Sequence, residues 1–350
     1  MPPNPDPTAE GERLLTICNA CRYCEGFCAV FPAMERRLNF TAADLNYLAN
    51  LCHNCAECYY ACQYAPPHEF AVNVPQALAE IREQSYRKYS WPRAMRIGAW
   101  WALVVGLIVT ILLARGRTAA DADFYAVISH RAMIATFGIV AVFILIAHLA
   151  GFARFWSESG EGFARFLHPA ALARAIRDVL SLANLSSGGA GCTYPDQRHS
   201  QARRRFHHFT FYGFLLCFAS TTTAAIFHYV LGLRAPYAYA SLPVVLGTLG
   251  GVGLLIGPIG LYAVKRHRDP AIADPKQDPM DVSFLALLFL SSLTGLLLLV
   301  LRETAAMGWL LAIHLGVVLG LFLTLPYGKF VHGIYRSAAL VRSALETARR

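Results

Sequence analysis

The sequence predicts a mainly α-helical protein, in which a cysteine-rich helical domain over residues 1–93 precedes a six-helix transmembrane bundle over residues 94–350. Three observations lead to this prediction. Two identical cysteine runs lie near the amino terminus, long apolar stretches fill the rest of the chain, and basic residues alternate between the connections of these stretches. With 56% hydrophobic residues and a mean hydropathy of +0.41, the chain is too apolar for an ordinary soluble domain of this length.

Eight of the ten cysteines form two runs with the spacing C-x2-C-x2-C-x3-C. The first run holds Cys18, Cys21, Cys24 and Cys28, and the second holds Cys52, Cys55, Cys58 and Cys62. This spacing is typical of ferredoxin-like segments with two iron–sulfur clusters, in which the fourth cysteine of each run ligates the other cluster. The sequence therefore predicts two [4Fe–4S] clusters. The predicted ligand sets are Cys18, Cys21, Cys24 and Cys62 for the first cluster, and Cys28, Cys52, Cys55 and Cys58 for the second.

Two other interpretations of the cysteine runs are weaker. A disulfide framework suits small secreted domains, but residues 1–16 are polar and lack the apolar core of a secretory signal peptide. Structural zinc is usually bound by separated C-x2-C pairs, whereas here four cysteines fall within each short run. Binding of zinc by the two cysteine runs is therefore the alternative to binding of iron–sulfur clusters.

Two helices are predicted around the second run. Thr41 is a suitable N-cap for a short helix over Asp44–Leu51, which has an acidic first turn. The segment Gln76–Tyr89 has the composition of a helix that leads to the first apolar stretch.

Six stretches provide the roughly 20 mostly apolar residues that cross a bilayer core. They are Ala94–Ala114, Ala132–Ala153, Phe206–Gly232, Pro243–Val264, Val282–Leu301 and Ala305–Phe330. Between the second and third spans, His168–Leu185 has one apolar face and is predicted to be an amphipathic helix at the membrane surface. The glycine-rich segment after it, Gly188–Cys192, is predicted to be a flexible loop.

The placement of the net charge of +9 predicts the topology. Lys and Arg are concentrated before the first span, between spans two and three, between spans four and five, and after span six. Basic residues mark the cytoplasmic side of membrane proteins. We therefore expect a multi-pass protein of the inner (cytoplasmic) membrane, with both termini and the cysteine runs in the cytoplasm. Lipid is an expected partner and nucleic acid is not, because these charges flank spans and do not form one patch.

Seven histidines lie in or beside the predicted spans, where ionisable residues are candidates for function. They are His130 and His148 in the second span, His207, His208 and His228 in the third, and His314 and His332 in the sixth. Histidine is a common axial ligand of haem iron. A separation of 18 residues within one helix, as for residues 314 and 332, places both side chains on one face, roughly 27 Å apart along the axis.

Helical periodicity favours His207 over His208 as the residue on the same face as His228. The polarity of the spans then pairs His314 with His228 toward the periplasm. It pairs His332 with His207, or with His208, toward the cytoplasm. The sequence thus predicts one or two b haems between the third and sixth helices.

Small residues such as Gly213, Gly316 and Gly320 are expected to leave room for the porphyrin. Ligation by His130 or His148, and histidines that merely lie in the interfacial region, are the alternatives. The remaining histidines singled out are expected to be solvated or locally hydrogen-bonded: His53, His68, His168, His199 and His267.

Six segments carry a resemblance to a known family. They are CNACRYCEGFC at Cys18–Cys28, LCHNCAECYYAC at Leu51–Cys62, APPHEFAVNVP at Ala65–Pro75, GCTYPD at Gly191–Asp196, RRRFHHFTFYGFLLCFAST at Arg203–Thr221, and GLLIGPIGL at Gly253–Leu261. Through these segments the chain resembles the tricarballylate (or citrate) utilisation protein B family, over nearly its whole length.

The resemblance implies a haem-containing membrane iron–sulfur protein that reoxidises the reduced flavin of a cytoplasmic FAD-dependent tricarballylate dehydrogenase. Electrons would then pass to the quinone pool. The chain is expected to be an electron-transfer component of an oxidoreductase, because it has no flavin or nicotinamide fingerprint of its own. Two alternatives are a quinol-oxidising subunit that feeds a cytoplasmic reductase, and a zinc-stabilised membrane transporter or sensor without electron transfer.

Overall fold

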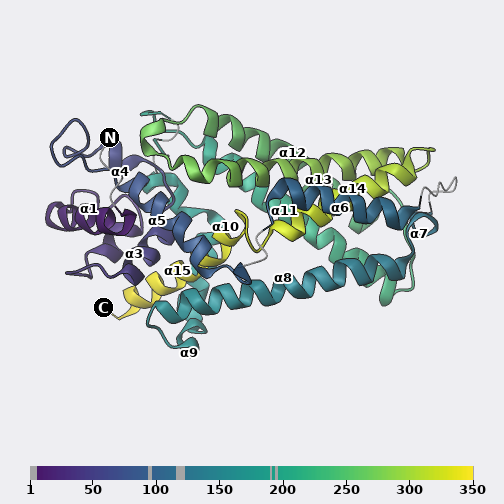
Figure 1. The fold of residues 1–350 in the computed structure, drawn as a ribbon, viewed down its shortest axis with the longest axis horizontal. Helices are drawn as coiled ribbons and strands as arrows, with labels where there is room; N and C mark the ends of the chain where they lie inside the picture. The colour runs from purple at the N-terminus through teal and green to yellow at the C-terminus, as the bar shows by residue number, and fades with distance from the viewer. Residues whose placement is uncertain (1–5, 94–96, 116–122, 190, 194–195, 350) are drawn as a thin grey trace.

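The computed structural model describes residues 6–93, 97–115, 123–189, 191–193 and 196–349. Within these residues the chain is helical, and its β-structure is one isolated bridge between Cys192 and Ser200. The molecule is elongated, with the amino-terminal helices and the last helix at one end and the longer helices running lengthwise away from them (Figure 1). Both chain termini lie at this end. The prediction of a mainly α fold is confirmed.

The described part of the cysteine-rich domain is built from α1 (Pro7–Cys21), α2 (Val30–Met34), α3 (Ala42–Leu51), α4 (Glu57–Tyr60) and α5 (Val74–Tyr89). A capping box starts α3: the Thr41 hydroxyl accepts a hydrogen bond from the Asp44 N–H, and the Asp44 carboxylate accepts one from the Thr41 N–H. The predicted cap is confirmed, although the helix begins before Asp44. The predicted helix at residues 76–89 corresponds to α5, which begins two residues earlier because Asn73 caps it.

Five described helices are long and apolar enough to cross a membrane. They are α8 (His130–Glu158), α11 (Ala202–Tyr229), α12 (Leu242–Arg266), α13 (Asp278–Leu301) together with the preceding turn η4 (Pro275–Gln277), and α14 (Met307–Thr324). A shorter apolar helix, α6 (Ala99–Ala114), packs against α14. These six helices correspond to the predicted spans. Ala94, the predicted start of the first span, lies outside the described residues.

Short elements join the long helices. They are α7 (Phe124–Val127), α9 (Phe163–Phe166), α10 (Pro169–Ser181), η2 (Ala183–Gly189) and η3 (Pro270–Ile272). The predicted amphipathic helix corresponds to α10, and Ile176 on its apolar face is 54% exposed.

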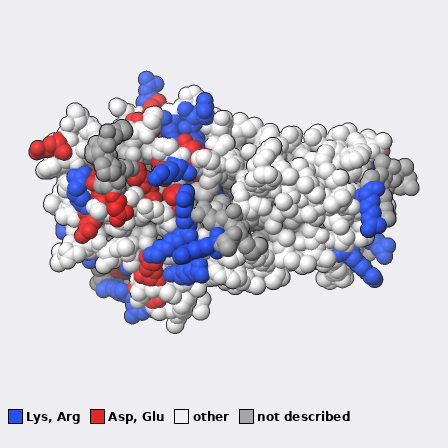
Figure 2. Space-filling view, viewed as in Figure 1, with Lys and Arg blue, Asp and Glu red and all other residues white. Residues whose placement is uncertain are grey.

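Charged side chains lie where a membrane-crossing chain requires them. On the face shown in Figure 2, Lys, Arg, Asp and Glu gather at the cysteine-rich end, a smaller basic group lies at the opposite tip, and the band between them is uncharged. The spans expose large apolar side chains such as Ile139 and Phe218. Exposure of such an apolar surface to water is energetically unfavourable, whereas its contact with lipid acyl chains is not.

The end of the sixth span differs from the prediction. The apolar stretch was expected to continue to Phe330, but α14 ends at Thr324 and Pro326 follows in the turn. Proline lacks an N–H and does not continue a helix favourably. A new helix, α15 (Val331–Ala348), begins after the turn. His332 therefore lies on α15, and the prediction that it belongs to the sixth span is wrong.

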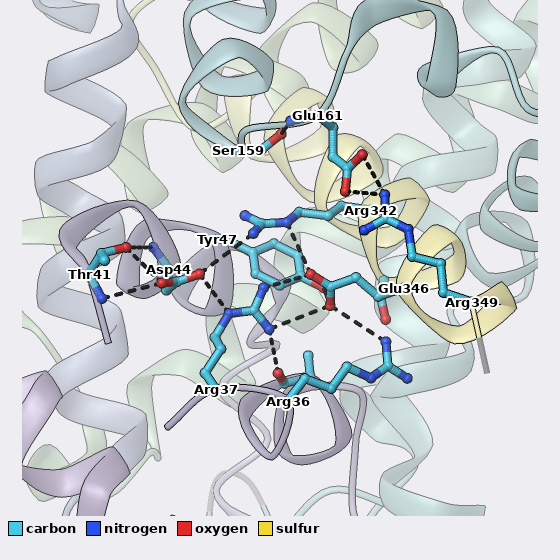
Figure 3. A network of polar contacts seen from close by, with 12 residues as sticks. Arg36, Arg37, Thr41, Asp44, Tyr47, Ser159, Glu161, Arg342, Glu346 and Arg349 are labelled. Carbon is cyan, nitrogen blue, oxygen red and sulfur yellow. Dashed lines mark hydrogen bonds and ion pairs between the residues drawn. The ribbon is translucent and has the colours of Figure 1, made fainter. Parts of the chain in front are cut away.

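Charged side chains join α15 to the cysteine-rich domain (Figure 3). Glu346 pairs with Arg37 at 2.6 Å and with Arg342 at 3.2 Å. Arg37 also pairs with Asp44 at 2.6 Å, and the Arg342 guanidinium lies 4.1 Å from the centre of the Tyr47 ring. None of the charged side chains is more than 18% exposed. These pairs are therefore screened by solvent much less than surface pairs are.

Glycines bring neighbouring spans into close contact. A Cβ atom on Gly106 of α6 would lie 2.2 Å from the Gly316 carbonyl oxygen of α14, and Gly320 also fits against α6. Gly213 of α11 fits in the same way against Gly250 of α12. From the sequence, three of these glycines, Gly213, Gly316 and Gly320, were predicted to leave room for a porphyrin. That assignment is wrong, because they make the backbone contacts typical of small residues between membrane helices.

Replacing Gly106 by Ala should push α6 away from α14, since the added methyl group overlaps a backbone carbonyl. Overpacking of this kind costs about 1–3 kcal/mol. The expected result is a lower Tm of the purified protein in detergent. Gly138→Ala on α8 is the matched control, because a Cβ there meets no atom within 4 Å. Equal Tm values for the two variants would contradict this account of the contact.

Replacing Glu346 by Gln should loosen α15 from the cysteine-rich domain. The variant leaves Arg37 and Arg342 with less compensating charge in a largely buried place, at a cost on the order of 2–3 kcal/mol. Thermal unfolding should show a lower Tm for this variant than for Glu303→Gln, since Glu303 is 69% exposed. A Tm equal to that of the wild type would show that the network does not stabilise the fold.

Candidate functional site

The two cysteine runs fold around two neighbouring cavities. The first cavity has a volume of about 260 Å³, and its cysteines are Cys18, Cys21, Cys24, Cys58 and Cys62. The second is much smaller, about 10 Å³, and its cysteines are Cys28, Cys52, Cys55 and Cys58. Each cavity thus collects three cysteines of one run and the fourth of the other, and Cys58 borders both.

Left-handed backbone positions let the thiols converge. Arg22, which follows the last residue of α1, has φ of 56°. Asn54 and Ala56, within the second run, have φ of 51° and 68°. Such residues turn the chain sharply, so that successive sulfurs face one cavity and do not spread around a helix. The Asn54 N–H also donates a hydrogen bond to the Cys52 Sγ at 3.3 Å.

The surroundings of these thiols disfavour negative charge unless a cation is present. Burial and the neighbouring cysteines raise the pKa of Cys18 and of Cys24 to about 12. Burial also raises the pKa of Cys28 and of Cys58 well above the usual range. Thiolates packed so closely require compensating metal charge.

The donor set of the two cavities fits iron–sulfur clusters. Each cavity is lined by at least four cysteines, which come from both runs. Iron–sulfur clusters are held by four cysteine thiolates. In the described part of the chain, no three His, Cys, Asp or Glu side chains form a group that could hold a single metal ion.

The two cavities differ in their exposure. The first opens at the surface, where Cys21 is exposed and Tyr23 is 69% exposed. In the second, Cys52 and Cys55 are buried, and Cys55 packs against residues of the membrane domain that include Cys192. An electron carrier in the first cavity would be accessible from solution, and one in the second would face the spans.

Cys192 is a site residue that the sequence did not single out. Its segment was predicted to be a flexible loop, but the structure has η2 there, followed by the bridge from Cys192 to Ser200; Ala190 lies outside the described residues. The Cys192 thiol is fully buried and donates a hydrogen bond to the Leu185 carbonyl at 3.0 Å. No local pattern indicates that this cysteine packs beside Cys55.

Three arginines from three helices converge on the backbone of the second run. Arg82 of α5 and Arg336 of α15 each donate a hydrogen bond to the Cys52 carbonyl oxygen at 2.6 Å. Arg203 of α11 donates to the Asn54 carbonyl oxygen at 2.6 Å. The sequence predicted none of these three arginines as a site residue.

His53 lies among these arginines and is only 7% exposed, so it is not solvated. Its hydrogen bond with the Leu51 backbone agrees with the other predicted alternative, a local hydrogen bond. Burial and the charges of Arg336 and Arg203 hold the pKa of His53 well below its usual range. Local polar contacts are made, as predicted, by His68, His168 and His267. His199 is exposed, as predicted, but its polar contact is with the distant Glu57.

At the cysteine-rich end of the spans, the ring centres of His207 and His332 lie 6.2 Å apart. Two imidazoles that ligate one iron from opposite sides, through metal–nitrogen bonds of about 2 Å, have ring centres roughly 6 Å apart. His332 Nδ1 lies 2.6 Å from the Lys329 carbonyl oxygen, a contact that leaves Nε2 free. His208 packs instead against Tyr212. The structure thus brings together the pair that the sequence favoured, and ligation itself stays a prediction.

At the opposite end of the spans, the histidines are arranged differently from the prediction. His228 was paired with His314, but it lies against His130, with ring centres 4.2 Å apart. That separation is too short for a haem iron between the rings. His314 Nδ1 lies 3.1 Å from Thr294 Oγ1, and His148 Nε2 lies 3.3 Å from a backbone carbonyl oxygen of the turn after α14. The pairing from the polarity of the spans failed here, because polarity gives the end at which a residue lies and not which helices are neighbours there.

The chain is similar to known proteins over nearly its whole length. Residues 11–88 match a family described as "Citrate utilization protein B Fer4-like domain", and residues 94–350 match one described as "Citrate utilization protein B". A "Citrate utilization protein B" of Escherichia coli is 51% identical over 360 residues, which cover 98% of this chain and 94% of that protein. No solved structure matches the chain. With its amino-terminal Fer4-like domain and its long apolar helices, the chain belongs to the Citrate utilization protein B family.

Proposed function

We propose that the protein is the membrane electron-transfer component of an oxidoreductase. It takes electrons from the reduced flavin of a partner FAD-dependent dehydrogenase of the tricarballylate type, and passes them through two [4Fe–4S] clusters and a b haem to quinone. One observation carries the proposal. Arg336 contacts the Cys52 carbonyl at the second cavity and lies one helical turn from His332, whose ring faces His207. Two candidate cofactor sites are thereby joined by a single helix.

The cysteines supply the iron–sulfur sites. The outer cluster is held by Cys18, Cys21, Cys24 and Cys62, and the inner cluster by Cys28, Cys52, Cys55 and Cys58. The grouping of the cysteines around the two cavities supports this assignment. Bound clusters would supply one-electron carriers, and the chain would tune them through burial and hydrogen bonds.

His207 and His332 would hold one b haem at the inner end of the span bundle. The 6.2 Å separation of their ring centres supports the pair. At the opposite end of the spans, His130 and His228 lie too close together to hold an iron between their rings, which argues against a second haem at that end. We therefore propose one haem.

The cysteine-rich end is proposed to face the cytoplasm. Both termini lie at this end, together with most of the charged side chains on the face shown in Figure 2, and the positive-inside rule assigns such an end to the cytoplasm. A cytoplasmic flavoprotein would approach the exposed rim of the first cavity, at Cys21 and Tyr23.

The visible spectrum of the purified protein tests the proposal as a whole. We expect a broad iron–sulfur band and, after dithionite, a sharp reduced haem α-band. His207→Ala and His332→Ala should each remove the α-band and leave the iron–sulfur band, because each removes one axial ligand. The control is His208→Ala, which should keep haem. A colourless protein that contains zinc would overturn the proposal, and full haem content in both ligand variants would overturn the assignment of the pair.

Iron and acid-labile sulfide content tests the cysteine sets. Cys62→Ala and Cys28→Ala should each lose one cluster, about half of the non-haem iron, because each cluster depends on one cysteine of the other run. Cys217→Ala on α11 is the control and should retain all of it, since Cys217 lines neither cavity. Wild-type iron content in both ligand variants would contradict the crossed assignment.

A further inference from the structure

The second cysteine run rests on a positively charged surface within the protein, here termed the arginine shelf and defined as Arg82, Arg203 and Arg336. Their guanidinium groups donate hydrogen bonds to backbone carbonyls between residues 49 and 54. Arg82 is 5% exposed. Burial, together with the charges of Arg82 and Arg203, lowers the pKa of Arg336. The shelf thus concentrates positive charge in a place from which water is largely excluded.

The charges of Arg82 and Arg336 are not offset as arginine charges are elsewhere in the domain. Arg37 and Arg342 are neutralised by Asp44 and Glu346. Among the described residues, by contrast, neither Arg82 nor Arg336 forms an ion pair, and their hydrogen-bond acceptors are carbonyl oxygens. Capping the carboxyl end of α3 explains the hydrogen bonds but does not require three full charges at one place.

The shelf acts on one cavity more than on the other. Cys52 and Asn54, which line the second cavity, accept hydrogen bonds from the shelf. In the described part of the chain, no residue that lines the first cavity accepts a hydrogen bond from a Lys or Arg side chain. Positive charge nearby stabilises an added electron, and it does so more strongly where the surroundings are dry.

We propose that the arginine shelf makes the second cysteine site the better electron acceptor of the two, so that electrons entering at the exposed first site move toward the membrane histidines. One electron leaves the first site, which is oxidised, and reduces the second; no bond forms or breaks and no proton moves. Arg82, Arg203 and Arg336 are positioning residues in this step. The inference rests on the proposed function, because it needs a cluster in each cavity.

Redox titration of the purified full-length protein, followed by electron paramagnetic resonance, tests the shelf. The signal of the second cluster is identified as the one that Cys28→Ala removes. In Arg336→Gln, the ratio of reduced to oxidised second cluster at a fixed ambient potential should fall about tenfold or more, which is about 59 mV for a one-electron couple. The first cluster should titrate as in the wild type.

Two variants separate charge from structure. Arg336→Lys keeps the charge and should titrate close to the wild type. Arg342→Gln removes a charge from the same helix that is buried but already paired, and it should lower the Tm without moving either potential. If Arg336→Gln does not assemble the second cluster, Arg82→Gln provides the same measurement from another helix.

The outcomes also separate this inference from the proposed function. A wild-type protein without clusters would defeat the proposed function. If both clusters assemble and each has the same potential in the wild type, in Arg336→Gln and in Arg82→Gln, the proposed role of the arginine shelf is wrong, whereas the proposed function is not affected. An equal shift of both clusters would also overturn it, because the shelf would then not distinguish the two sites.

Discussion

The packing of α15 against the cysteine-rich domain is the constraint on which the rest of the structure depends. One helix carries Glu346 and Arg342, which bind the domain through Arg37 and Asp44, and also Arg336, which binds the second cysteine run. The same helix carries His332 in its first turn. If α15 separated from the domain, the second cavity would lose a hydrogen bond to its backbone and its link to the histidine pair at the spans.

The two cysteine runs have the same spacing but not the same surroundings. The first run begins in the last turns of α1, and its cavity opens at the surface at Cys21. The second run lies between the arginine shelf and the membrane domain, where Cys55 is buried. Exposure, charge and hydrogen bonds set the potential of an iron–sulfur cluster. Identical ligand spacing can therefore give an outer site suited to accept electrons from a partner and an inner site suited to pass them on.

Helix packing explains which predictions about the spans were wrong. The sequence assigned Gly213, Gly316 and Gly320 to cofactor space because small residues can make room for a porphyrin, but they also let helices approach closely, and here they do so. The prediction for His332 assumed one straight helix, whereas Pro326 lies in the turn where α14 has ended. The pairing of His228 with His314 followed from the polarity of the spans, which places residues at one end of the bundle but does not say which helices are neighbours; His228 lies against His130 instead.

By itself the sequence determined the helical class, the cysteine spacing, the approximate spans and the cap at Thr41, because each depends on residues close together in the chain. Only the tertiary structure decided that Cys58 borders both cavities, that Cys192 lies beside Cys55, and that arginines from α5, α11 and α15 meet at one run. These contacts join residues separated by tens to hundreds of positions. Their geometry follows from how whole helices pack, and local sequence patterns do not predict it.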